Sequence, residues 1–191
     1  MVKSDRTPDV RCGHETPTAL SRVLCMPTIC RMIQLSPDDA ASLAANPASL
    51  PDHVTPANKY GDVYRYWHAI EYLLAQHRPG SAAARWLAMG TPVSPATADI
   101  PSARLLSTRQ VRELHADLRD IQPEDLVEHY DAAALDAARI YPATWREWEE
   151  TFDPLGQVLE HYSFLQIGTE NFVKSGVALL LYFEVLPEGM V

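Results

Sequence analysis

The chain has 191 residues, of which 47% are apolar, and its 25 acidic residues outnumber 16 basic ones, for a formal net charge of -9. This length is enough for a soluble domain that buries its own core without metals or disulfides. The acidic balance argues against nucleic acid and anionic membranes as partners, because both attract basic surfaces. Neither a membrane-spanning run of about 20 apolar residues nor a secretory signal is evident, so we expect a cytoplasmic protein.

The first 27 residues differ from the rest of the chain. They mix both charges with prolines and show no hydrophobic periodicity, which predicts a disordered extension before a single domain at 28–191. A zinc site there would need four ligands, and the available set is Cys12, His14, Cys25 and Cys30. These residues lack the two closely spaced pairs typical of such sites, so we predict reduced thiols, no metal and no cofactor.

Hydrophobic periodicity and capping signals predict the elements of the domain in chain order. Strands are predicted at 28–35, 103–106 and 177–185. Helices are predicted at 37–45, at 62–77 with Asp62 as the cap, at 81–89, after the capping box at Ser107, after Pro123, after Asp131, and from Pro154 to Gly176. Loops are predicted at 46–61, with room for one helical turn, and at 91–101, where prolines are frequent.

The last of these strands defines the fold class. Residues 177–185 are almost all apolar, which is typical of a strand that is covered on both faces. We therefore place it at the centre of a small sheet. Because strands and helices do not alternate regularly, the sequence predicts an α+β fold in which several helices pack against that sheet.

Several motifs in this order resemble the YfbM-like family of bacterial proteins, a domain of unknown function. They are the segments 62–74, 102–107 and 140–142, and a final helix that leads into an apolar strand. The likeness covers about residues 30–185. It implies a compact α+β fold in a bacterial cytoplasm and no known activity. The chain departs from the family at Tyr64, where members have aspartate, at Glu71, where they have histidine, and at Ala75-Gln76, where they often have Thr-Gly.

Two segments carry candidate site residues. The first combines polar and aromatic side chains that could form the edge of a cleft, with a histidine that titrates near neutrality: Asp62, Arg65, Trp67, His68 and Glu71. On a helix, Asp62 could also pair with Arg65 one turn later. The alternative is that Trp67 is core, Asp62 is a cap and His68 is solvated. The second could form an aromatic recognition surface, or could instead wedge a loop against the core: Tyr141, Trp145, Arg146, Glu147 and Trp148.

Isolated histidines give weaker signals. His115 lies on the apolar face of its helix, where a buried, hydrogen-bonded histidine is expected. The tripeptide Glu-His-Tyr occurs at 128–130 and at 160–162, and two facing Glu-His pairs could hold a metal. Adjacent helical residues point about 100° apart, however, so each pair would be a poor clamp. We predict no metal there.

The sequence contains no Gly-rich phosphate loop, no Gly-x-Ser-x-Gly elbow, no His-Glu-x-x-His and no Cys-x-x-Cys. We therefore predict a non-enzymatic domain that binds a protein, of the inhibitor or immunity type, with a more basic partner. The alternative is a small enzyme or ligand-binding protein with an acid-base site near His68 and Glu71. The sequence assigns no reaction and no oligomeric state.

Overall fold

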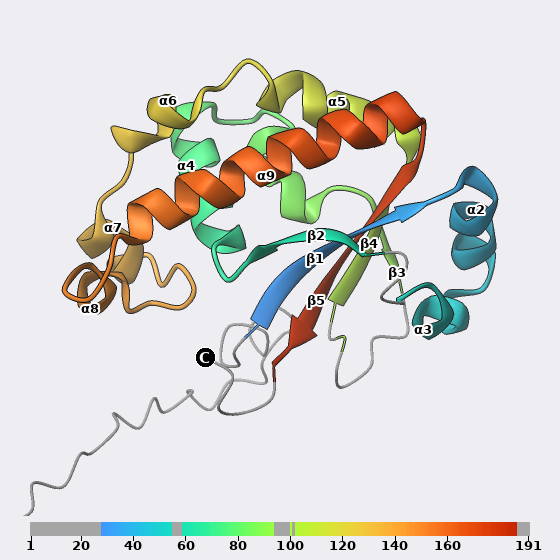
Figure 1. Cartoon of the computed structure of the whole chain (residues 1–191), viewed down its shortest axis with the longest axis horizontal. Coiled ribbons are helices and arrows are strands. Elements are labelled where there is room, and N and C mark those ends of the chain that lie inside the picture. The colour runs from blue at the N-terminus through green and yellow to red at the C-terminus, as the bar shows by residue number, and fades with distance from the viewer. Residues whose placement is uncertain (1–27, 55–58, 94–99, 101, 187–191) are drawn as a thin grey trace, which may run out of the picture.

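The computed structural model describes residues 28–54, 59–93, 100 and 102–186 (Figure 1). The predicted extension at 1–27, with three of the four candidate zinc ligands, lies outside the described residues. In the described part of the chain, none of the helices combines the length and the apolar run that crossing a bilayer requires.

A five-stranded antiparallel sheet forms the centre of the fold, in the order β2-β1-β5-β4-β3. Its strands are β1 (Thr28–Leu35), β2 (Lys59–Tyr64), β3 (Thr91–Val93), β4 (Ser102–Leu106) and β5 (Ala178–Val185). The predicted central position of the last strand is confirmed. Along β5 the side chains alternate between two apolar clusters, one on each face of the sheet, which is why nearly every residue of the strand is apolar.

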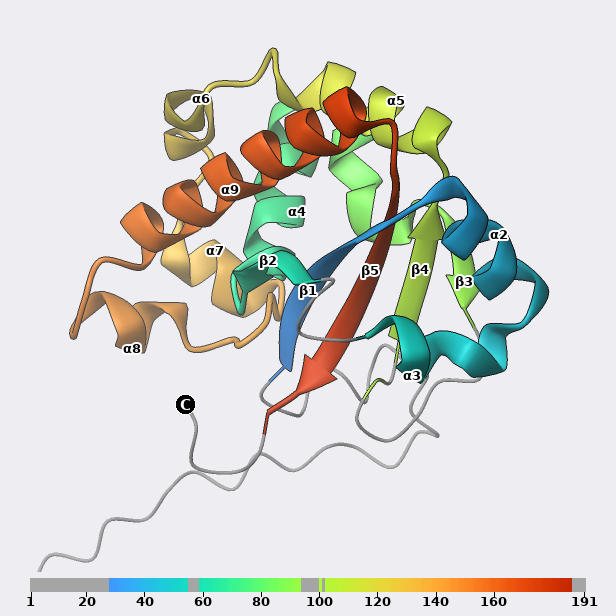
Figure 2. The ribbon, with the colours of Figure 1, turned by 45° about the vertical axis from the view of Figure 1, so that its right-hand side comes forward.

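Helices cover both faces of the sheet, as Figures 1 and 2 show. Leu43 and Leu50, from α2 and α3, belong to the smaller cluster together with Ile33 of β1. The larger cluster lies beneath α4, α5 and α9. The predicted α+β class is confirmed. The helices are α2 (Pro37–Ala45), α3 (Leu50–His53), α4 (Trp67–His77), α5 (Thr108–Leu118), α6 (Pro123–Val127), α7 (Ala132–Ala137), α8 (Trp145–Glu149) and α9 (Pro154–Ser175), with 3-10 turns at Pro47–Ser49 and Ala83–Ala88.

The predicted helix boundaries are confirmed where side-chain caps define them. The Ser36 hydroxyl accepts a hydrogen bond from the Asp39 amide at 3.1 Å, and Ser107 forms a capping box with Gln110. The Asp153 carboxylate accepts one from the amide of Gly156 at 2.8 Å. These bonds satisfy amide groups that the first helical turn leaves without partners, so the local sequence alone determines them.

The predicted cap at Asp62 is wrong. Residue 62 lies in β2, and α4 begins five residues later, at Trp67. Val63 belongs to β2 and is buried there. Its spacing of four residues from the buried Trp67 therefore looked like helical periodicity, although the two residues lie in different elements. The Asp62 carboxylate instead accepts a hydrogen bond from the Tyr64 amide at 3.1 Å, which stabilises the turn that ends β2.

The segment predicted as a loop, 91–101, begins with the short strand β3. The sequence did not predict this strand because it contains Pro92. Pro92 lacks an amide hydrogen, and β3 lies at the edge of the sheet, where a missing donor is tolerated. Arg104 anchors the preceding turn, because its Nε donates to the Met89 carbonyl at 2.7 Å and its Nη2 to the Gly90 carbonyl at 3.0 Å. The edge strand is therefore held from β4 by both its backbone and a side chain.

Candidate functional site

Three adjacent strands, β2, β1 and β5, contribute one residue each to a half-buried ion network. The Arg31 guanidinium of β1 donates from Nη1 to Asp62 Oδ2 and from Nε to Glu184 Oε2, each at 2.7 Å. A hollow of about 270 Å³ opens beside it. Its lining comes from β1, β2 and α9: Met32, Gly61, Asp62, His161 and Phe164. Asp62, a predicted site residue, thus lies in a hollow but pairs with Arg31 rather than with Arg65.

A row of rings extends from this hollow along α9 to the end of α8. Successive ring centroids are 6.0, 4.8, 6.1 and 5.3 Å apart. We call this row the aromatic stripe, and its members in order are Phe164, His161, Tyr66, Trp148 and Phe152. Both ends are exposed, with Phe164 51% and Phe152 42% accessible. Ile167, 53% accessible, lies three residues after Phe164 and so extends the exposed apolar face along α9.

Arg65 covers the middle of the aromatic stripe. Its guanidinium carbon lies 5.2 Å from the ring centroid of Trp148 and 4.9 Å from that of Tyr64, which are cation-π distances. Arg65 and Trp148, predicted as members of separate clusters, are therefore neighbours. The sequence-based candidates for a recognition surface did not include Phe152, His161, Phe164 or Ile167, although exposed apolar residues on a helix are the signal that could have pointed to Phe164 and Ile167.

A second group of predicted residues forms a buried stack. The Trp67 ring lies 5.1 Å from His68 and 5.4 Å from Tyr141, nearly parallel to both. The Tyr141 amide donates a hydrogen bond to His68 Nδ1 at 2.9 Å. The Tyr141 hydroxyl accepts one from the Thr28 amide, also at 2.9 Å. Burial lowers the pKa of His68 to about 4, so the ring is neutral at pH 7. The sequence-based alternatives were a ring that titrates near neutrality and a ring that is solvated. The half-buried, hydrogen-bonded ring of His68 matches neither.

Glu71 lies one turn after Trp67 on α4 but binds a different segment. Its Oε1 accepts a hydrogen bond from the Leu87 amide at 3.2 Å. Burial raises the pKa of Glu71 to about 7, although the bond from Leu87 opposes that rise. Of the predicted acid-base pair, the carboxyl therefore titrates near neutrality and the imidazole does not. The catalytic role of the pair stays a prediction.

The buried carboxyl makes stability depend on pH. The folded-state pKa of Glu71 lies above the ordinary 4.5, so its stabilising contribution is complete below pH 4.5 and is lost as the pH rises to about 7. We expect Glu71→Gln, which keeps the oxygen that accepts from Leu87, to be more stable than the parent at pH 8 by up to about 3 kcal/mol and nearly equal to it at pH 4.5. Urea unfolding of both proteins across this range measures the difference.

Taking the difference between the two proteins isolates the carboxyl. The His68 pKa is lowered, so its contribution is complete above pH 6.5 and is lost as the pH falls towards 4, the opposite direction. This contribution is common to the parent and to Glu71→Gln and cancels in the comparison. A difference that stays constant between pH 4.5 and 8 would contradict the assigned environment of Glu71.

The remaining predicted residues surround α8. Trp145 is fully buried, and its Nε1 donates to the Ile140 carbonyl at 2.8 Å. The Asp136 carboxylate accepts from the amides of Trp145 and Arg146 at 2.7 and 3.2 Å, and so caps the helix from α7. The side chains of Arg146 and Glu147 are exposed. Tyr141 and Trp145 thus wedge the loop against the core, and only Trp148 of the three rings reaches the surface.

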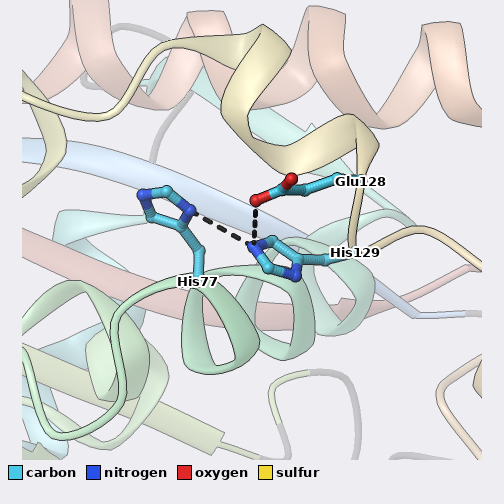
Figure 3. Close-up of side chains that lie close together, drawn as sticks. All are labelled: His77, Glu128 and His129. Atoms are coloured by element: carbon cyan, nitrogen blue, oxygen red, sulfur yellow. Dashed lines mark hydrogen bonds and ion pairs between the residues drawn. The ribbon is translucent and has the colours of Figure 1, made fainter.

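A cluster of metal-ligating side chains lies elsewhere, where α4 ends beside the turn after α6 (Figure 3). One ligand atom from each of His77, Glu128 and His129 lies within 4.8 Å of the others. The second Glu-His pair does not join them, because the His161 ring packs against Tyr66. Cys30 is the one candidate zinc ligand near the N-terminus that lies among the described residues. It is buried in β1, and this burial raises the pKa of its thiol, which disfavours the thiolate form that binds zinc.

Comparisons with known proteins give a family and a fold. A family model described as a domain of unknown function (DUF1877) matches residues 26–182. Among solved structures, the chain is similar to YfbM from Escherichia coli, a protein of unknown function, with a TM-score of 0.62 at 12% identity. The alignment covers 81% of this chain and 99% of that one. No curated protein matches the chain.

Proposed function

The chain belongs to the DUF1877 family of domains of unknown function, and from this premise we propose that it is a non-enzymatic bacterial protein of the cytoplasm that binds a more basic protein. The partner is of the kind that an inhibitor or immunity protein recognises. The aromatic stripe, with its exposed ends at Phe164 and Phe152, is the observation that carries this proposal.

The stripe has the composition of a protein-binding surface. Aromatic side chains and arginine are enriched at such interfaces, because they bury a large area and lose little conformational freedom. Phe164 and Ile167 would supply apolar anchors on a rigid helix, and the hollow beside Phe164 could accept a side chain of the partner. Most of the binding energy would then come from the end of the stripe on α9.

The charges around the stripe favour a basic partner. Exposed carboxylates lie on the two helices that carry most of the stripe, α8 with the residue after it and α9: Glu147, Glu149, Glu150 and Glu160. Together with the net charge of -9, they would attract a basic surface and speed its association. Screening of that attraction predicts faster binding at low salt than at high salt.

The test combines capture with a matched variant. The full chain is used to capture proteins from the native host at low salt, alongside the double variant Phe164→Ser, Ile167→Ser and the control Val127→Ser, an exposed apolar residue on α6. We expect a partner with a high isoelectric point that binds the parent and the control equally and the double variant about tenfold or more weakly. Its association with the parent is expected to slow as salt is added.

Two outcomes would overturn the proposal. One is that no protein binds the parent saturably at low salt. The other is that the captured partner binds the double variant as tightly as the parent, in which case the stripe is not the binding surface. Because Phe164 and Ile167 are exposed, melting temperatures that match the parent verify that any lost binding does not reflect lost folding.

A further inference from the structure

His77, Glu128 and His129 come together from segments that are distant in sequence. His77 is the last residue of α4, and the other two follow α6 directly. The Nδ1 atom of His77 lies 3.3 Å from Nε2 of His129, and that same Nε2 lies 3.4 Å from Oε1 of Glu128. Figure 3 shows His77 and Glu128 approaching the same nitrogen of His129.

These separations are those of ligands around one metal ion. Tetrahedral zinc has ligand bonds of about 2.0–2.2 Å, which places neighbouring ligand atoms about 3.3–3.6 Å apart. The two shortest separations in the cluster, 3.3 and 3.4 Å, fall in this range. All three ligand atoms lie within 4.8 Å of one another, so rotation of the side chains would have to bring the third pair closer around an ion.

Glu128 and His129 are adjacent in sequence and lie in the turn that ends α6. Within a helix Glu128 and His129 would point about 100° apart, but α6 ends at Val127 and both residues lie in the turn that follows. Glu128 keeps helical φ and ψ values of -66° and -17°, and the His129 amide bonds to the Leu126 carbonyl at 3.2 Å in a tightened turn. The two side chains nevertheless approach each other, because Oε1 of Glu128 lies 3.4 Å from Nε2 of His129. The half-buried rings of His77 and His129 are also close to ring contact, with centroids 5.4 Å apart, which limits their orientations.

Electrostatics at this position favour a cation. The carboxyl end of α4 carries the negative end of the helix dipole, and Glu128 adds a carboxylate. The positive charge next to His77 in the chain is that of Arg78, whose Nη1 donates to the Asp117 carbonyl of α5 at 3.5 Å. We propose that His77, Glu128 and His129 bind one divalent transition-metal ion of the Zn²⁺ class, with a fourth position open to water or to an outside ligand.

The ligand set determines the class of metal. Two imidazoles and one carboxylate suit Zn²⁺, Co²⁺ and Ni²⁺ better than Ca²⁺ or Mg²⁺, which prefer oxygen ligands alone. Three protein ligands leave a coordination position vacant, unlike the four of a closed structural site. Since the ligands belong to α4 and to the turn after α6, the bound ion would also link these two elements.

The test titrates the full chain with Zn²⁺ and with Co²⁺, in a background in which Cys12→Ser and Cys25→Ser remove thiols outside the described residues. We expect one equivalent to bind, a visible Co²⁺ spectrum without a thiolate charge-transfer band, and a melting temperature that rises with Zn²⁺. His77→Gln and His129→Gln should each weaken binding about tenfold or more, while the control His115→Gln, on α5, should not.

Each alternative result has a definite meaning. Absence of metal binding in the background protein would overturn the proposal, and so would unchanged affinity in both His77→Gln and His129→Gln. The two variants change different elements, and their metal-free melting temperatures are measured first, so a folding defect in one leaves the other as a test. The metal titration uses no protein partner. The metal site and the proposed protein-binding function can therefore fail independently of each other.

Discussion

Trp67→Ala is expected to lower the free energy of unfolding by about 3 to 5 kcal/mol, the range for removing a large aromatic side chain from a core. The Trp67 ring is only 2% exposed and meets Phe183 of the central strand edge to face, with centroids 4.9 Å apart. Its Nε1 donates to the Thr28 carbonyl of β1 at 3.3 Å. The substitution therefore removes packing between α4 and two strands at once, as urea unfolding at pH 7 would measure.

A second tryptophan provides the control. Trp148 is partly exposed on the aromatic stripe and packs at the margin of the core. We expect Trp148→Ala to cost about 1 kcal/mol, as is usual for positions that leave no enclosed cavity. If the two substitutions lowered stability equally, burial of Trp67 in the stack with His68 and Tyr141 would not be the source of its contribution.

Gly90→Ala is expected to destabilise the fold by about 2 to 5 kcal/mol, for two independent reasons. Gly90 has a φ of +79°, which L side chains rarely adopt. A Cβ atom there would also lie 2.6 Å from the Leu105 carbonyl oxygen and 2.9 Å from Cδ1 of Leu106. Because the closest atom belongs to the backbone of β4, only a shift of the strand could relieve the clash. Thermal and urea unfolding measure the loss.

Gly80 separates the two reasons. Its φ is +82°, nearly the same, but nothing lies within 4 Å of a Cβ built on it. Gly80→Ala should therefore cost only the backbone strain, about 1 to 2 kcal/mol. Equal losses for the two alanine variants would show that contact with β4 contributes nothing at Gly90.

The sequence was informative about this fold wherever a local interaction decides the structure. Ser36, Ser107 and Asp153 cap helices through bonds to residues two or three positions away, and all three helices begin where the sequence predicts. The motifs that resemble the YfbM-like family lie in the matched region, and that resemblance is confirmed. The strand β2 escaped prediction because it is stabilised by pairing with β1, about 30 residues earlier in the chain, and β3 escaped because it contains Pro92, which only an edge position tolerates.

The candidate sites were harder to predict, because they depend on which elements meet. Arg65 and Trp148 were both singled out, but 83 positions separate them in the numbering and no local pattern shows that they touch. The prediction against a metal at Glu128 and His129 considered only the two Glu-His pairs, and no local pattern places His77 beside one of them. His77 carried no signal beyond ending its helix, since its partners come from another element.

The place of β5 in the sheet affects how the protein is made. β5 pairs with β1 on one side and with β4 on the other, yet it is the last described strand to leave the ribosome. Until it emerges, β1 and β4 have no common partner and their apolar residues remain open to solvent or to other nascent chains. Closure of the core thus waits until β5 has been translated, and a chain terminated before Ala178 becomes a substrate for chaperones and proteases rather than a partial domain.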